Sequence, residues 1–185
     1  MFHVKHHNHI EAYIKLLKKY NETTNIYSKK SYDKLPFHIE DSVNIANMIT
    51  DDKLTVVDIG SGSGFPSVIT AICNKNNKVY AVESKSRKCE FLRLCKHELA
   101  LENYEIINMD VNEFLNKQKK GFADFFTAKA FGPMQKTEKI FVQTKKPGAK
   151  LIIPISKQQE IDAPTFLRHQ FKIHKINDFL YLILQ

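Results

Sequence analysis

Residues 58–66 read Asp-Ile-Gly-Ser-Gly-Ser-Gly-Phe-Pro, and this stretch decides the fold. It completes a short apolar run, residues 54–59, that has the length and the β-branched content of a buried strand. A helix is predicted directly after it, over residues 66–73, because proline is tolerated in the first turn of a helix. A strand that passes through a glycine-rich turn into a helix is typical of the first unit of a doubly wound α/β sheet.

The same alternation of strand and helix continues along the chain and defines the fold class. Further strands are predicted at residues 78–83, 104–109, 122–128 and 150–154, and helices at 87–100, 111–118 and 135–144. The last two strands, residues 171–176 and 179–184, are joined by only Asn177-Asp178 and must therefore be antiparallel. We expect a Rossmann-like α/β fold with a mostly parallel sheet and an antiparallel C-terminal hairpin.

Two amphipathic helices, at residues 9–20 and 38–49, precede the sheet and flank a polar turn region at 21–34. We therefore divide the chain into an N-terminal helical extension, residues 1–50, and a single compact α/β domain, residues 51–185. The three cysteines form no CxxC pair and no apolar run is long enough to span a membrane. The start of the chain lacks the apolar core of a secretory signal, so we expect a cytoplasmic protein without a membrane partner.

The net charge of +8 is unevenly distributed. Residues 1–35 carry seven Lys and Arg against three Asp and Glu, residues 36–116 carry eight against twelve, and residues 117–185 carry thirteen against five. Basic ends around a near-neutral middle favour a polyanionic partner. The alternative is a set of solvated lysines without a partner.

The glycines at 60, 62 and 64 follow the pattern GxGxG, which differs from the GxGxxG of dinucleotide sites. A dinucleotide needs a helix N-terminus for its pyrophosphate. S-adenosylmethionine has no phosphate, and its methionine and ribose portions lie across such a loop, where a Cβ would block their approach. We therefore predict S-adenosylmethionine as the cofactor, beside Gly60, Gly62 and Phe65.

Three other positions at the ends of strands are predicted to contact this cofactor. Glu83 ends the second strand, where nucleoside sites place the acid that binds both ribose hydroxyls. Val111 and Asn112 follow the third strand, on the adenine side, and Lys129 follows the fourth. The alternative is a tight turn accompanied by solvent-facing acids.

Several segments resemble one family, the glucose-inhibited division protein B family, which methylates N7 of a guanine in 16S ribosomal RNA. The resemblance covers about residues 10 to 155 and is most specific in its first two-thirds. It implies an S-adenosylmethionine-dependent methyltransferase that acts on 16S ribosomal RNA or on the small ribosomal subunit, and we expect a monomer. The segments that carry it are residues 20–26, 38–42, 58–66, 82–88, 91–93, 97–103, 128–131 and 146–148.

The chain departs from the family pattern on the side that faces RNA. Phe37, Asp110 and Lys129 stand where the family has arginines, and Lys does not reproduce the planar fork of Arg. Pro154-Ile155-Ser156 also replaces a Leu-Lys-Gly segment. Either the RNA contacts have moved to other lysines, or catalysis has weakened. Two other readings follow, a non-catalytic RNA-binding descendant and a methyltransferase for another substrate.

Guanine N7 carries a lone pair and no hydrogen, so its methylation needs no general base, and we assign no catalytic residue. Lys129 and Phe131 follow the fourth strand, where a methyl acceptor is expected; otherwise they are a solvated lysine and a core phenylalanine. His38 and Asp41 lie three residues apart on one helix face, and we favour a structural contact over a substrate-side pair. The histidines at 3, 6, 7 and 9 have no Cys or acidic partner pattern, so no metal site is predicted.

Overall fold

The computed structural model of the chain describes residues 3–118 and 121–185. Their strands form one sheet in the order β3-β2-β1-β4-β5-β7-β6. β7 is antiparallel to both of its neighbours, while the other neighbouring strands are parallel. The predicted fold class is therefore confirmed. The strands are β1 Thr55–Ile59, β2 Lys78–Glu83, β3 Tyr104–Asn108, β4 Phe125–Ala128, β5 Lys150–Ile155, β6 Phe171–Ile176 and β7 Phe179–Leu184.

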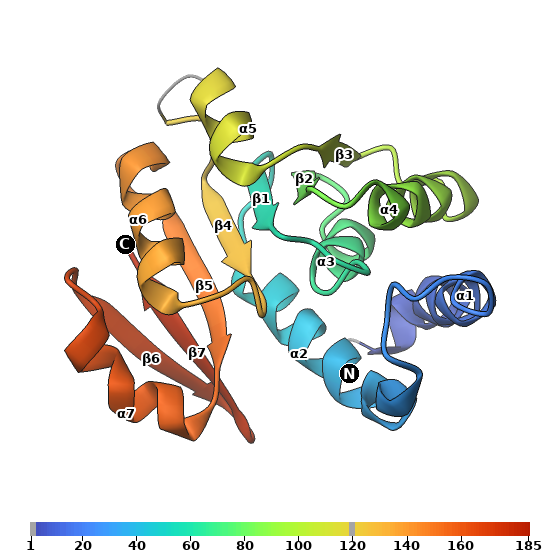
Figure 1. Cartoon of the computed structure of the whole chain (residues 1–185), viewed down its shortest axis with the longest axis horizontal. Coiled ribbons are helices and arrows are strands. Elements are labelled where there is room, and N and C mark those ends of the chain that lie inside the picture. The colour runs from blue at the N-terminus through green and yellow to red at the C-terminus, as the bar shows by residue number, and fades with distance from the viewer. Residues whose placement is uncertain (1–2, 119–120) are drawn as a thin grey trace.

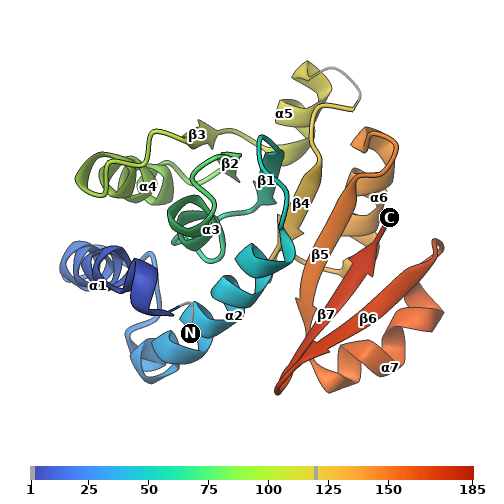
Figure 2. The ribbon, with the colours of Figure 1, turned by 180° about the vertical axis from the view of Figure 1, so that it is seen from behind.

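Helices cover both faces of the sheet and make a three-layer molecule (Figure 1). One face packs against α1 to α4 and the other against α5 to α7, as two separate hydrophobic clusters show. The view from behind shows α1 and α2 beside α3, at the edge where the glycine turn leaves β1 (Figure 2). The helices are α1 His3–Tyr20, η1 Lys29–Lys34, α2 Leu35–Met48, α3 Ser67–Cys73, α4 Ser86–Glu98, α5 Val111–Lys117, α6 Met134–Thr144 and α7 Lys157–Phe166.

The central strands are apolar on both sides because both of their faces are covered. In β1, Val56 contributes to the cluster under α1 to α4, whereas Val57 contributes to the cluster under α5 to α7. Successive side chains of a strand point to opposite faces, so a continuous apolar run fills both clusters. This arrangement explains why the strand at residues 54–59 could be recognised from its sequence.

The structure corrects the predicted secondary structure at several places, among them α2, which begins at Leu35 rather than at residue 38. α7 was not predicted, because Ala163 is its one buried residue and Pro164 interrupts the pattern. Its sequence signal was the capping box of Ser156 and Gln159, which bond each other's backbone N–H groups. The predicted turn region also contains a 3-10 helix, η1. α1 begins at His3 rather than at residue 9, and β4 begins at residue 125 rather than 122.

The N-terminal helices are part of the same core as the sheet. Tyr13 of α1 is fully buried, and its hydroxyl donates a 2.7 Å hydrogen bond to the carbonyl of Ser63 in the glycine turn. Asn74, at the end of α3, donates to the carbonyls of Ala46 and Ile49 at the end of α2. No helix among the described residues is long and apolar enough to cross a membrane.

We predict that Tyr13→Phe lowers the free energy of unfolding by about 1–3 kcal/mol, because it leaves the half-buried carbonyl of Ser63 without its donor. The measurement is urea unfolding followed by circular dichroism. Tyr20→Phe is the matched control, since its hydroxyl bonds the carbonyl of Arg87 at an exposed position where water can replace it. An equal loss in both variants would show that the Ser63 contact has no special weight.

Candidate functional site

The turn between β1 and α3 is built on glycines in the left-handed region. Gly60, Gly62 and Gly64 have φ values of 72°, 59° and 102°. A Cβ at Gly60 would lie 2.6 Å from Cδ2 of Phe131, and one at Gly64 would lie 2.6 Å from Cγ2 of Val68. These two glycines are therefore required by the packing of the protein itself.

Gly62 differs from the other two because its outer face is open. A Cβ there would meet only the carbonyl oxygen of Gly60 at 3.8 Å and Nζ of Lys88 at 4.0 Å. The space above this residue can therefore admit a ligand against the backbone. A pyrophosphate is less suited to it, because Pro66 has no N–H and the N–H of Val68 already bonds the carbonyl of Gly64. The turn fits a ligand without phosphate, as its GxGxG pattern predicts.

Glu83, at the carboxyl end of β2, lies directly beside this open face. One carboxylate oxygen accepts the N–H of Gly62 at 2.9 Å and the other accepts the N–H of Lys85 at 2.8 Å. The side chain is buried, so the carboxylate is held in one orientation. Each oxygen keeps a second lone pair, which can accept a ligand hydroxyl. The structure thus brings together Gly60, Gly62 and Glu83, three of the residues selected from the sequence.

Asp58 lies under the glycine turn, and no role was assigned to it from the sequence. Its carboxylate is fully buried and accepts a 2.8 Å hydrogen bond from the hydroxyl of Thr127 on β4. Burial raises the pKa of Asp58 to about 6, although the hydrogen bond from Thr127 opposes this shift. The signal available in the sequence was a carboxylate inside an apolar strand, since such a group needs a partner.

Lys129 follows β4 and forms a buried ion pair with Asp41 of α2, with 2.6 Å between Nζ and Oδ2. The ammonium also lies 5.8 Å from the ring centroid of Phe65. His38 joins this group through its ring, 5.8 Å from that of Phe65. Burial and the nearby Lys129 lower the pKa of His38, which favours the neutral imidazole. We call these four residues, His38, Asp41, Phe65 and Lys129, the acceptor cluster.

The pairing of His38 and Asp41 with Lys129 was not predicted. The sequence placed the first two on one helix face and the third at the end of a strand, without a link between them. α2 lies next to the carboxyl end of β4 only in the folded chain. Asp41 is 2% exposed, so its charge depends on Lys129 for compensation.

The two residues selected on the adenine side, Val111 and Asn112, begin α5. Val111 is buried in the cluster that also contains Val82 of β2. Asn112 is exposed, and its N–H donates to Asp110, which caps α5. That hydrogen bond lowers the pKa of Asp110. One departure from the family pattern, Asp110, therefore has a local structural role as a helix cap.

Phe37, another departure, packs on Phe179 at the start of β7, with 4.8 Å between the ring centroids. Its side chain is still 53% exposed. Phe131 covers Gly60 and lies under the ammonium of Lys136, 4.5 Å from the ring centroid. Phe131 is thus part of the wall of the glycine turn.

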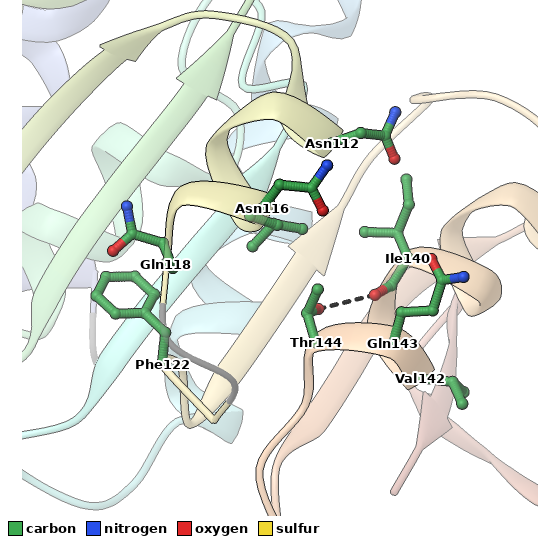
Figure 3. Close-up of a pocket in the computed structure, with 9 residues that line it drawn as sticks. Asn112, Asn116, Gln118, Phe122, Ile140, Val142, Gln143 and Thr144 are labelled. Atoms are coloured by element: carbon green, nitrogen blue, oxygen red, sulfur yellow. Dashed lines mark hydrogen bonds between the residues drawn. The ribbon is translucent and has the colours of Figure 1, made fainter.

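A separate cavity of about 500 Å³ lies between α5 and α6 (Figure 3). Its lining is rich in amide side chains, including Asn112, Asn116 and Gln143, and none of the described residues that line it is ionisable. It extends to Thr144, which ends α6 and donates to the carbonyl of Ile140. The cavity therefore extends away from the glycine turn, toward the amino end of β5, which follows Thr144 in the chain.

Of the four histidines near the N-terminus, the structure describes the side chains of His6, His7 and His9. His7 pairs with Glu11 of the same helix at 3.6 Å, and His9 is exposed. The side chain of His3 lies outside the described residues. Among the residues that the structure describes, no group of three or more His, Cys, Asp or Glu could hold a metal ion.

The order of the strands and the glycine turn after β1 are those of the S-adenosylmethionine-dependent methyltransferase fold. The protein belongs to this structural class. A crystal structure of such a methyltransferase from Aquifex aeolicus superposes with a TM-score of 0.62 at 17% identity, covering 85% of this chain and 97% of the other. Residues 6–179 match the family described as rRNA small subunit methyltransferase G. The chain belongs to this family.

Several relatives bear the name ribosomal RNA small subunit methyltransferase G. The protein from Brachyspira hyodysenteriae is 36% identical over 151 residues, which are 81% of this chain and 71% of that protein. The protein from Fusobacterium nucleatum is 35% identical over 111 residues, which are 60% of this chain but only 48% of the relative. The resemblance noted in the sequence is thus confirmed at the level of the family.

We predict that the free energy of unfolding of the wild-type chain, taken relative to that of Asp58→Asn, falls as the pH rises from 4 to about 6. Because the pKa of Asp58 is raised in the folded state, this group stabilises the fold fully at pH values below its ordinary pKa, 3.8, and loses that contribution as the pH rises through about 6. The total change is about 3 kcal/mol. Urea unfolding of both proteins across this range measures it, and parallel pH curves would contradict the assignment.

We predict that Gly62→Val weakens the binding of S-adenosylmethionine at least tenfold, because the new side chain fills the open face beside Glu83. Gly148→Val is the matched control. Gly148 also has a positive φ, 81°, and open space around its Cβ position, so both variants carry similar backbone strain. Calorimetric titration should show a loss for Gly62→Val alone. Equal affinities in the two variants would show that the cofactor does not bind at this turn.

Proposed function

We propose that the chain transfers a methyl group from S-adenosylmethionine to N7 of a guanine in small-subunit 16S ribosomal RNA. The observation that carries the proposal is the open backbone at Gly62, which lies beside the fixed carboxylate of Glu83. Membership of the rRNA small subunit methyltransferase G family supports the RNA substrate. The chain would act in the cytoplasm, as a monomer, on the RNA or on the assembled small subunit.

When bound, S-adenosylmethionine supplies an electrophilic methyl group on a sulfonium. Gly60, Gly62 and Glu83 would hold its methionine and ribose portions, and Val111 and Asn112 would lie on its adenine side. Guanine N7 offers a lone pair and loses no proton, so the protein needs no general base. Its task is to hold N7 in line with the methyl group and to keep water away.

The acceptor cluster suits this task for an electrostatic reason. Methylation places positive charge on the purine, and a bare ammonium nearby would oppose it. Here Asp41 neutralises Lys129, while the face of Phe65 can interact favourably with a cationic ring. The pair therefore allows a basic residue to position the acceptor without repelling the product.

We predict that Lys129→Ala abolishes methyl transfer and also destabilises the fold by about 3–5 kcal/mol, because it leaves the buried Asp41 uncompensated. Lys129→Arg should keep activity within about fivefold, since it preserves the charge. The assay is transfer of labelled methyl to small ribosomal subunits that lack their N7 mark, combined with thermal melting.

A double variant separates the two effects. Asp41→Asn combined with Lys129→Met removes both charges, so most of the stability should return. If Lys129 positions the acceptor, transfer stays low in this variant although it is folded. Recovery of transfer together with stability would show that the ion pair only supports the fold. Binding of cofactor without any transfer by the wild-type chain would overturn the proposed activity.

A further inference from the structure

A second cavity, of about 480 Å³, lies on the outer side of the glycine turn. Its wall includes Asn25 and Ser28 of the segment before η1, Lys29 and Lys30 at the start of η1, and Lys88 in the first turn of α4. Its volume is within the range of sites for small ligands. The function described above assigns no role to this cavity, which we call the lysine cavity.

The charge of the lysine cavity has one sign. Three lysines line it, and no carboxylate does. Among the described residues, four lysines form ion pairs with acids: Lys96 with Glu105, Lys117 with Glu113, Lys129 with Asp41 and Lys146 with Asp124. No ion pair of this kind is found for Lys29, Lys30 or Lys88 in residues 3–118 and 121–185. Three ammonium groups around one hollow create a positive potential that favours an anion.

The lysine cavity is adjacent to both halves of the proposed active site. Lys88 borders the open face of Gly62, since its Nζ lies 4.0 Å from the Cβ position there. Tyr27 is also in the cavity wall, and its ring lies 6.1 Å from that of Phe65 and 6.2 Å from that of His38. An anion in the cavity would therefore be held at a set position relative to the glycine turn and to the acceptor cluster.

We propose that the lysine cavity binds a backbone phosphate of the RNA substrate and thereby sets the position of the target nucleotide. This inference rests on the proposed function. Lysine ammonium groups are common phosphate ligands, and the side chains of Asn25 and Ser28 add neutral donors that phosphate oxygens accept. Such a contact carries no sequence information, but it fixes the register of the RNA on the enzyme.

The proposal also accounts for the arginines that the chain lacks. Phe37 and Asp110 contribute packing and a helix cap where RNA-binding charge is expected from the family pattern. The lysine cavity provides three cations at a different place on the same edge of the sheet. The phosphate contacts have, on this view, moved from α2 and α5 to η1 and α4.

The test compares two triple variants that remove the same charge. The first is Lys29→Ala, Lys30→Ala and Lys88→Ala. The control is Lys139→Ala, Lys157→Ala and Lys172→Ala, three exposed lysines on α6, α7 and β6. Binding of 16S ribosomal RNA transcribed in vitro is measured from low to physiological salt, and binding of S-adenosylmethionine is measured by calorimetry.

We expect the cavity variant to bind RNA about tenfold to a hundredfold more weakly at physiological salt, and its salt slope to fall by about one, as the loss of one phosphate contact requires. The control should change affinity by less than about threefold, and both should bind S-adenosylmethionine as the wild type does. A third variant, Lys29→Arg, Lys30→Arg and Lys88→Arg, keeps the three positive charges and should bind RNA as the wild type does.

Three results would overturn the proposal. Equal losses in the two alanine variants would show that only the overall charge matters. Weakened cofactor binding with unchanged RNA binding would assign the cavity to the cofactor's carboxylate. RNA binding at the wild-type level in the cavity variant would exclude this site alone. A fourth result, a wild-type chain that fails to bind the RNA, would remove the proposed function as well.

Discussion

The left-handed backbone of the turn from Gly60 to Gly64 is the constraint on which the rest of the molecule depends. Residues with a Cβ rarely adopt such φ values, and at two of these glycines a Cβ would also collide with a neighbouring side chain. The turn lets the chain leave β1 over the end of β2, where the carbonyl of Val82 accepts the N–H groups of Gly60 and Ser61. Glu83 can then reach the backbone of Gly62.

The same turn organises the helices that precede the sheet. Tyr13 reaches Ser63 from α1, and Phe65 packs its ring against Tyr13 with 5.2 Å between centroids. From α2, Asp41 reaches Lys129 beyond β4. The N-terminal helices are therefore bound to the site at two points. This explains why a segment outside the α/β repeat contributes His38 and Asp41 to the acceptor cluster.

The charges of the molecule follow two different physical rules. The buried charges are paired or hydrogen-bonded, as Asp41 is with Lys129 and Glu83 with the backbone, because an isolated charge is costly in a low-dielectric interior. The exposed lysines of the lysine cavity bear no such cost and remain available for a partner. The proposed function benefits from this separation, because it requires the protein to hold both a purine ring that becomes cationic and a polyanionic RNA strand.

The sequence by itself determined the local structure and the cofactor loop. The strands could be predicted from apolar runs that end in polar residues. The glycine pattern indicated a ligand without phosphate. Both signals depend only on residues that are neighbours in the sequence. Glu83 could be selected for the same reason, since it stands at the end of a predicted strand. α7 could not be recognised, because its packing buries too little apolar surface to leave a periodic pattern.

Only the tertiary structure decided which distant residues meet. Asp41 and Lys129 are far apart in the chain, as are Lys30 and Lys88, and each pair comes together because α2 and η1 pack at the carboxyl edge of the sheet. Tertiary packing also assigned Asp58 its bond to Thr127, which is set by the register of β1 against β4. Periodicity and spacing describe one element at a time, whereas a site is formed by the contacts between elements, and those depend on how the whole core packs.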